Sequence, residues 1–352
     1  MAKTKIGFIG TGMMGRAHLE TFSALADAEI AAVCDVQKDV ADGAAEMYGI
    51  SRVYYSADEL LAQSDIEGVI IAVPVYAHHE VAIKAANAGK AVFLEKPMAV
   101  NAAQAREIVT CCKENNVPLL VGYCSRYSPQ YMAAREFVKS GALGDIYYAN
   151  TAMQRQRGTP YGWFNDSAKA AGGCLMDVGV HMIDVSWYLM GCPKPVAAKA
   201  LNYNKIENMF GKGGPTGPET YVAFEKGDKF DVETESVGVI TFENGVSLMY
   251  RIAWAYNGVE IEEIVELQGN KGGINFNVLG KLLLFREECG VVTETNLPYD
   301  EKDCYYEQGK HFIAIIRGEA TPMCTGAEGI TVQKMIDALY ESAKSGREVA
   351  IN

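Results

Sequence analysis

The sequence is short of positive charge and has no hydrophobic run of membrane-spanning length. Its 32 lysines and arginines stand against 44 aspartates and glutamates, which gives a formal net charge of −12. The basic residues are scattered, so we expect no nucleic-acid partner. The apolar stretch around residues 69–77 is too short to cross a bilayer, and the N-terminal apolar run is too short for a signal peptide. We therefore expect a cytoplasmic protein with no membrane partner.

The cysteines lack the spacing of a disulfide framework or a zinc site. There are nine, an odd number, and the only close neighbours, Cys111 and Cys112, are adjacent instead of spaced as C-x-x-C. Such a pattern predicts neither kind of cross-link. We expect no metal.

The length of the chain predicts two domains. A domain usually has about 100–200 residues, and this chain has 352. Its 49% hydrophobic and 22% charged residues are typical of a globular protein. We place the domains at residues 1–123 and 124–352.

Strand and helix patterns alternate through the first domain. Short apolar runs, typical of buried strands, occupy residues 5–10, 29–35, 53–56, 68–74, 91–95 and 118–122. Helical patterns separate them, and capping boxes are predicted at Ser56-x-x-Glu59 and Asn101-x-x-Gln104. This alternation predicts a doubly wound parallel sheet, in which ligands bind at the carboxyl ends of the strands.

The second domain is predicted to have a different architecture. Strand candidates cover residues 146–156, 196–204, 235–242, 246–256, 262–269, 273–278 and 282–285. Asn244-Gly245 is a hairpin signal between two of them. We expect a largely antiparallel sheet, with helices at 303–317 and 327–344 and a loop over 207–229.

A glycine-rich turn follows the first strand. It reads G-x-G-x-x-G, with the residues Gly10, Thr11, Gly12, Met13, Met14 and Gly15. Gly10 permits the tight turn, Gly12 lets a pyrophosphate approach the backbone, and Gly15 lets the helix pack on the strand. Asp35 ends the next strand 20 residues later, the position of the carboxylate that binds the adenosine ribose. The pattern predicts a dinucleotide site.

Asp35 also favours NAD over NADP. A 2′-phosphate would meet its carboxylate, and Val36 and Gln37 supply no arginine to reverse the preference. Lys38 is close enough to weaken this discrimination. His18, in the first helix, is interpreted as a structural residue.

Two more segments bring together groups that can transfer protons. Glu95-Lys96-Pro97 ends the fifth strand, and the Lys96–Pro97 bond is a candidate for the cis form. Asp177 and His181 are spaced i, i+4 on an apolar helical pattern that Asp184 continues at i+7. The carboxylate could orient the imidazole as a general base. A purely structural Asp–His pair, or a metal site with a third ligand, are the alternatives.

The order of these motifs resembles the Gfo/Idh/MocA family, which includes glucose–fructose oxidoreductase and inositol dehydrogenase. The resemblance covers nearly the whole chain, although Val75 stands where Asn or Thr is commoner in the family. It implies a Rossmann domain and an α/β domain whose large open sheet often makes oligomer contacts. It also implies contacts to the dinucleotide from Val73, Pro74, His78, Glu95, Lys96 and Arg126.

The same resemblance implies that Lys96, Asp177 and His181 converge on the nicotinamide. In hydride transfer, His181 would act as general base, Asp177 would orient it or share substrate hydroxyls, and Lys96 would stabilise charge on the reacting oxygen. Substrate contacts are expected from Arg155, Arg157, Tyr161 and Trp163, because aromatic rings stack on sugars and arginines bind hydroxyls or carboxylates.

The resulting prediction is an NAD-dependent oxidoreductase that acts on a sugar, glycoside or inositol-type polyol and forms a homodimer or homotetramer. Two alternatives remain. One is a glycosidase in which bound NAD oxidises the sugar transiently, and the other is a non-catalytic ligand sensor.

Overall fold

The computed structural model describes residues 2–160, 162–206, 229–277 and 280–352. The chain forms two compact units. Unit 1 comprises Met1–Tyr127 and Lys302–Gln333, and unit 2 comprises Ser128–Glu301 and Lys334–Asn352. This grouping differs from a single division after residue 123, because a late segment packs with unit 1. The loop predicted over 207–229 falls almost entirely outside the described residues.

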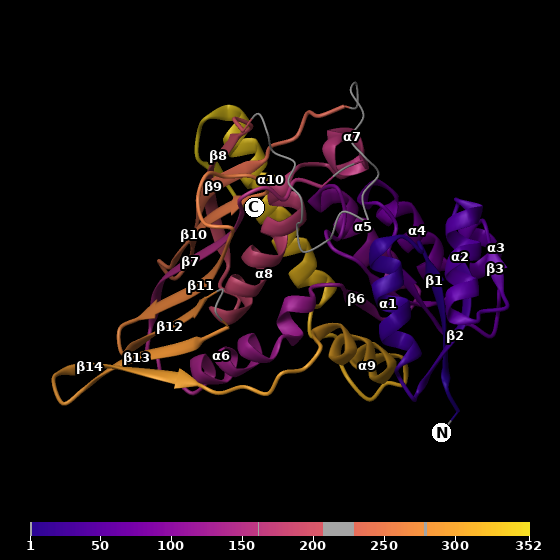
Figure 1. Ribbon diagram of the computed structural model, residues 1–352, viewed down its shortest axis with the longest axis horizontal. Helices are drawn as coiled ribbons and strands as arrows, with labels where there is room; N and C mark the ends of the chain where they lie inside the picture. The colour runs from indigo at the N-terminus through magenta and orange to yellow at the C-terminus, as the bar shows by residue number, and fades with distance from the viewer. Residues whose placement is uncertain (1, 161, 207–228, 278–279) are drawn as a thin grey trace. The chain divides into compact units, whose positions relative to one another are not determined.

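Unit 1 contains a parallel six-stranded sheet with the order β3-β2-β1-β4-β5-β6 (Figure 1). Its strands are β1 (Thr4–Ile9), β2 (Ala28–Cys34), β3 (Val53–Tyr54), β4 (Gly68–Ile71), β5 (Ala91–Leu94) and β6 (Leu119–Val121). The predicted doubly wound sheet is confirmed. The strand order reverses between β1 and β4, which is where such sheets bind ligands.

The helices of unit 1 follow the predicted pattern with one local difference. They are α1 (Met13–Ser23), α2 (Lys38–Tyr48), α3 (Ala57–Leu61), α4 (Val75–Asn87), α5 (Ala102–Glu114), the short η1 (Cys124–Tyr127) and α9 (Cys304–Ile316). The side chain of Asn101 caps α5 by accepting the Gln104 N–H at 3.0 Å. The Ser56 side chain makes no such cap, because the Glu59 N–H bonds the Ser56 carbonyl instead.

Helix α9 belongs to the core of unit 1 although it comes late in the chain. Phe312 meets Phe93 edge to face, with ring centroids 5.5 Å apart. Phe312 and Ile313 share one buried cluster with Phe8 and Phe22. This packing explains why the late segment groups with the N-terminal residues.

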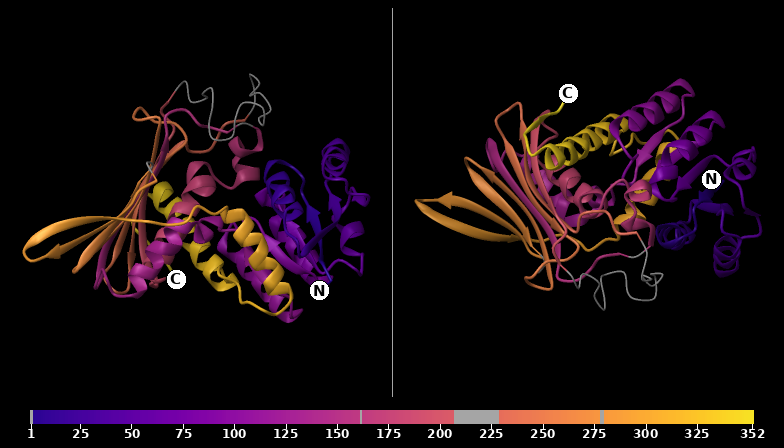
Figure 2. Two further views of the ribbon diagram at one scale, coloured as in Figure 1. Left: turned by 60° about the horizontal axis from the view of Figure 1, so that its bottom comes forward. Right: turned by 90° about the horizontal axis from the view of Figure 1, so that it is seen from above.

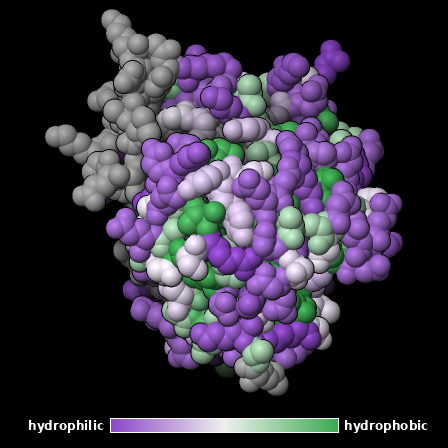
Figure 3. All heavy atoms as spheres, turned by 90° about the vertical axis from the view of Figure 1, so that its right-hand side faces the viewer, coloured by the Kyte–Doolittle hydropathy of each residue, from purple (hydrophilic) through white to green (hydrophobic). Residues whose placement is uncertain are grey.

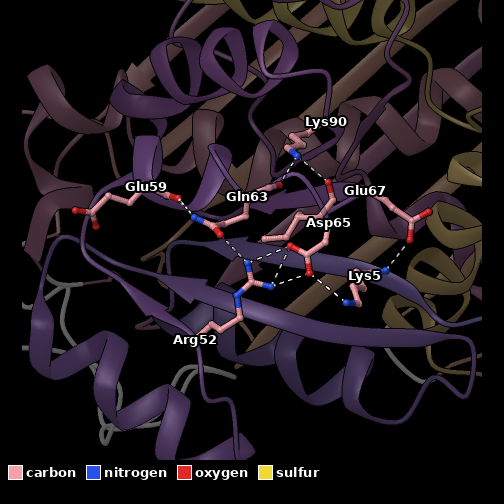
Figure 4. Close-up of polar contacts among 8 residues, drawn as sticks. Lys5, Arg52, Glu59, Gln63, Asp65, Glu67 and Lys90 are labelled. Atoms are coloured by element: carbon pink, nitrogen blue, oxygen red, sulfur yellow. Dashed lines mark hydrogen bonds and ion pairs between the residues drawn. The ribbon is translucent and has the colours of Figure 1, made fainter.

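A polar network ties together the amino ends of the strands (Figure 4). Arg52 holds Asp65 through its two terminal guanidinium nitrogens, and Lys5 adds a bond to the same carboxylate at 3.1 Å. Lys90 donates to the carbonyls of Gln63 and Ile66. These contacts lie at the amino ends, opposite the carboxyl ends at which such sheets bind ligands. The face of unit 1 turned to the viewer in Figure 3 is largely hydrophilic.

Unit 2 contains a nine-stranded sheet with the order β14-β13-β12-β11-β7-β10-β9-β8-β15. The strands are β7 (Ile146–Arg155), β8 (Pro195–Tyr203), β9 (Glu235–Phe242), β10 (Ser247–Ala253), β11 (Ile261–Gly269), β12 (Gly272–Asn277), β13 (Leu282–Glu288), β14 (Val291–Leu297) and β15 (Val349–Ala350). Only β7 and β10 pair in parallel among these strands, so the predicted antiparallel character is confirmed.

Helices cover one face of this sheet. They include α6 (Pro129–Lys139) and α8 (Val180–Leu189), which packs on β7, β10 and β11 (Figure 1). The remaining helical segments are η2 (Gly162–Asn165), α7 (Ser167–Ala170), the π-helix η3 (Leu175–Gly179) and α10 (Gly326–Ser345), whose residues from Lys334 onward belong to unit 2. Helix α6 and strands β14 and β15 were not anticipated.

The opposite face of the sheet carries no helix in the described part of unit 2 (Figure 2). On this face Val239 lies between its pairing partners Met249 and Lys199. The next row pairs Val237 with Leu201 and Arg251. Met249 and Leu201 are 48% and 47% exposed. Exposed apolar side chains therefore alternate with basic ones on this face, and large exposed apolar groups are typical of a protein contact surface. None of the described helices combines the length and hydropathy needed to span a membrane.

Candidate active site

The three glycines of the β1–α1 turn have separate structural roles. Gly10 has a φ of 91°, and a Cβ there would lie 2.5 Å from the Ala72 carbonyl oxygen. A Cβ at Gly15 would lie 2.1 Å from the Gly10 oxygen. A Cβ at Gly12 would meet no protein atom within 4 Å. The fold therefore requires Gly10 and Gly15, whereas Gly12 keeps open a space beside the start of α1.

That space suits the pyrophosphate of a dinucleotide. Gly12 is the N-cap of α1 and provides no side chain to the helix N-terminus. The first-turn N–H groups therefore face the space without a side-chain cap, and a helix N-terminus favours a phosphate. Met13 and Met14 open the helix and are partly exposed. The residues present thus fit the cofactor that the motif predicts.

Asp35 has a second role besides the predicted ribose contact. Its carboxylate accepts the Thr11 N–H at 2.9 Å and the Gln37 N–H at 3.0 Å. One N–H of the glycine-rich turn is therefore bonded to protein and does not face a phosphate. The ammonium of Lys38 lies over the Tyr55 ring, 4.9 Å from its centroid.

His78 joins the loops that follow β4 and β5. Its Nδ1 lies 2.8 Å from the Pro97 oxygen and its Nε2 lies 2.8 Å from the Val73 oxygen. Burial lowers the pKa of His78, although both carbonyls act in the opposite direction. The side chain is 1% exposed and has almost no surface for a cofactor. Val73 and Pro74 are partly exposed and remain candidate contacts.

Glu95 lies beneath the loop that carries Lys96. Its Oε1 is 2.6 Å from Nε2 of His18, and both side chains are buried. Its Oε2 accepts the Lys96 N–H at 3.0 Å, and the Lys96–Pro97 peptide is cis. A Cβ at Gly122 would lie 3.1 Å from Glu95, so this glycine makes room for the carboxylate. The structural interpretation of His18 is confirmed. Glu95 holds the loop through its bond to the Lys96 N–H.

Arg126 is also an internal residue. Its guanidinium is fully buried and donates to the Met323 carbonyl at 2.9 Å and to Glu328 at 3.1 Å. Like His78 and Glu95, it has a role in placing backbone, and the predicted direct contact with a cofactor stays a prediction.

Asp177 and His181 are in unit 2, on a helical segment that is not a regular α-helix. Residues 175–179 form the π-helix η3, and α8 begins at Val180. The expected regular α-helix is therefore interrupted, because i→i+5 bonding changes the rotation between the residues before and after it. That Asp177 and His181 share one face stays a prediction. Asp184 is fully buried, whereas Asp177 and His181 are partly exposed among mostly buried neighbours.

A tryptophan holds the Asp177 carboxylate. Nε1 of Trp254 donates to Oδ2 of Asp177 at 3.0 Å. Trp254 directly follows β10, whose last residue, Ala253, pairs with Gln154 of β7. Asp177 is thus tied to the end of the sheet where Arg155 lies. Sequence reasoning missed Trp254, although it lies near the end of the strand predicted over residues 246–256, where ligands are expected.

The predicted substrate residues occupy different environments. Arg155 is partly exposed at the end of β7. The Arg157 guanidinium donates to the Tyr256 carbonyl and to Asn257, both at 3.0 Å, and so supports a turn. Trp163 stacks on Phe164 with centroids 4.1 Å apart, which occupies one face of its ring. Tyr161 lies outside the described residues. Across the described ranges no three His, Cys, Asp or Glu side chains gather as metal ligands.

Comparison with known proteins agrees with both halves of this description. Residues 4–123 match the model of an oxidoreductase family described as having an NAD-binding Rossmann fold. Residues 135–351 match the model of the C-terminal alpha/beta domain of the same oxidoreductase family.

Individual relatives extend over nearly the whole chain. D-glucoside 3-dehydrogenase of Escherichia coli is 27% identical, over 99% of this chain and 97% of that protein. Inositol 2-dehydrogenase of Rhizobium meliloti is 25% identical, over 99% of each chain. The crystal structure of GenD2 from gentamicin A biosynthesis, in complex with NAD, has a TM-score of 0.83 at 25% identity and covers 100% of this chain and 97% of its own. The chain therefore belongs to the Gfo/Idh/MocA family of oxidoreductases and contains its NAD-binding Rossmann domain and its C-terminal α/β domain.

Proposed function

We propose that this protein is an NAD-dependent dehydrogenase that oxidises a secondary alcohol of a sugar, glycoside or inositol-type polyol. The observation that carries the proposal is the pair Asp177 and His181. These residues are partly exposed on an otherwise mostly buried segment, and the Asp177 carboxylate is fixed by Trp254. Polar groups on a mostly buried segment are costly unless they have partners, and the part of each side chain that stays exposed can meet a substrate hydroxyl.

Each candidate residue has a chemical task. His181 accepts the proton of the substrate hydroxyl, and Asp177 orients His181 or binds a neighbouring hydroxyl. Lys96 donates a hydrogen bond to the oxygen that becomes a carbonyl and stabilises its developing negative charge. Bound NAD would supply the hydride acceptor, held at the Gly12 space and by Asp35.

The names of two relatives support the substrate class. D-glucoside 3-dehydrogenase and inositol 2-dehydrogenase each align with almost the full chain. Arg155, at the same sheet end as Asp177, is the candidate to bind further hydroxyls. We extend the proposal to a homodimer or homotetramer formed through the exposed sheet face, and to NAD in preference to NADP through Asp35.

A panel of sugars and polyols, assayed at 340 nm with purified protein and NAD, tests the reaction. Net formation of NADH with a free polyol supports the dehydrogenase. Release of an aglycone without net NADH would instead support the NAD-assisted glycosidase, and binding without either would support a sensor.

Two variants test the assigned roles. His181→Asn should lower kcat by about 10²–10⁴-fold, the usual contribution of a positioned general base. Lys96→Met should lower kcat by about 10²–10³-fold, the usual loss on removing one donor to a developing oxyanion. NAD affinity and melting temperature should stay close to wild type, because the dinucleotide is held by other residues. A destabilised but fully active His181→Asn protein would show that His181 is structural.

A further inference from the structure

The helix that carries Asp177 and His181 begins in a buried position and needs partners for its first N–H groups. The first intrahelical bond within this segment runs from the Asp177 N–H to the Gly173 carbonyl at 3.0 Å. The four preceding N–H groups, from Gly173 to Met176, therefore depend on groups outside the helix. Helix ends without such partners are costly when buried.

Glu233 satisfies three of these four groups. The Gly173 N–H lies 3.0 Å from both carboxylate oxygens, and the Leu175 N–H lies 3.0 Å from Oε1. The Cys174 N–H donates to the Glu233 backbone carbonyl at 3.1 Å. Glu233 is buried, and it comes from the segment before β9, 60 residues from Gly173. A negative charge at a helix N-terminus is also favoured by the helix dipole.

Tyr340 of α10 completes the set. Its hydroxyl accepts the Met176 N–H at 3.2 Å and donates to Oε1 of Glu233 at 2.8 Å. The carboxylate and the phenol thus form one connected cap over the start of the helix.

The glycine pair before the helix is explained by this cap. A Cβ at Gly173 would lie 1.9 Å from the Glu233 carbonyl oxygen, and a Cβ at Gly172 would lie 2.0 Å from the Tyr340 hydroxyl. Neither glycine has a positive φ. Close approach, and not backbone conformation, is therefore the reason for glycine at both positions.

We infer that Glu233 and Tyr340 are positioning residues for the reaction. They fix the rotation and depth of the helix start, one turn before Asp177, and the Trp254 bond fixes the Asp177 side chain at its other end. This inference rests on the proposed function for its kinetic consequences, while its geometric content concerns unit 2 alone.

Tyr340→Phe is the principal test, because it removes one hydroxyl and keeps the ring. Ser342→Ala is a matched control on the same helix. The Ser342 hydroxyl is also buried and shared by two partners, since it accepts the Ala200 N–H at 3.0 Å and donates to the Arg347 carbonyl. It does not bond the N–H groups of residues 173–176.

The kinetic test compares the effect of each variant on kcat with its effect on the NAD dissociation constant. Tyr340→Phe should lower kcat by about 10–100-fold, as expected for a small misplacement of reacting groups. The NAD dissociation constant should stay within about twofold of wild type, and Ser342→Ala should keep kcat within about twofold. Glu233→Gln, which turns an amide donor toward N–H groups, should have at least as large an effect. If Glu233→Gln fails to fold, Tyr340→Phe decides alone.

A second readout does not depend on activity. The protein has three tryptophans, so ¹⁵N-labelled indole signals can be assigned with Trp→Phe variants. The Trp254 indole signal should move in Tyr340→Phe and Glu233→Gln and stay in place in Ser342→Ala. Should wild type lack dehydrogenase activity, the proposed function fails and this signal still tests the positioning. Equal effects of Tyr340→Phe and Ser342→Ala on kcat and on the Trp254 signal would overturn the inference.

Discussion

Gly12→Ala should weaken NAD binding and leave the stability of the protein nearly unchanged. Gly15→Ala should instead lower the stability. Gly12 has an extended backbone, with φ −68° and ψ −158°, that alanine can adopt. Its new methyl group would touch no protein atom within 4 Å. The weaker N-cap preference of alanine lowers the free energy of unfolding by about 0.5–1 kcal/mol. The smaller conformational freedom of the unfolded chain with alanine raises it by a similar amount. The melting temperature of Gly12→Ala should therefore change little.

NAD affinity should fall in Gly12→Ala, because the methyl group occupies the space proposed for the pyrophosphate. Loss of one hydrogen bond to a charged group costs about 1.5–3 kcal/mol, or about 10–150-fold in the dissociation constant. Gly15→Ala should instead destabilise the protein, because its Cβ would lie 2.1 Å from a backbone oxygen of Gly10. Overpacking of this kind costs about 1–3 kcal/mol, which lowers the melting temperature by several degrees.

The two properties can be measured on the same preparations, by differential scanning calorimetry without cofactor and by calorimetric titration with NAD. An unchanged NAD affinity in Gly12→Ala would refute the assignment of the phosphate site. A lower melting temperature in Gly12→Ala than in Gly15→Ala would refute the steric argument.

Three further predictions concern other parts of the chain. Asp35→Ala should lower the affinity for NAD more than the affinity for NADP. Equal losses of affinity, measured by titration with each cofactor, would contradict the assignment of Asp35 to the ribose. Met249→Glu on the exposed sheet face should shift the mass measured by light scattering toward the monomer, and a wild-type monomer at micromolar concentration would contradict the oligomer. Hydrogen bonds from Arg52 and Lys5 lower the pKa of Asp65 to about 2. Because the folded-state pKa is depressed, the stability that Asp65 contributes is present above about pH 4 and is lost as the pH falls toward 2. As the pH falls from about 4 to 2, the melting temperature of Asp65→Asn should fall by less than that of wild type. An equal fall in both proteins would exclude this contribution.

The parallel sheet and the dinucleotide turn could be predicted because their signals are local. Apolar runs that end in Gly10, Asp35 and Glu95 encode both the strands and the positions at their carboxyl ends. Helix α6 was missed although its buried residues, Tyr131 and Ala134, follow helical spacing. Most of β14 is exposed, so this strand shows no apolar alternation by which it could be found.

The supports of the candidate site could not be predicted because they come from distant segments. Glu233, Tyr340 and Trp254 meet the 173–177 segment through long-range contacts. The π-helix was hidden for a related reason. The spacing of Asp177 and His181 fits an α-helix, and only tertiary packing decides that one turn is wider. Likewise, His78 and Arg126 were identified by motif, whereas their burial depends on neighbours far along the chain.

The return of α9 to the first unit has a consequence for synthesis of the chain. Phe312 and Ile313 belong to the same apolar cluster as Phe8 and Phe22. A ribosome must therefore make almost the entire polypeptide before the N-terminal unit can close its core. Until then the apolar surface that α9 covers is exposed while the residues of unit 2 emerge, which is the period of greatest exposure to aggregation or chaperone binding. Premature termination before residue 304 would leave the nucleotide-binding unit incomplete even though the glycine-rich turn, Asp35 and Lys96 had all been translated.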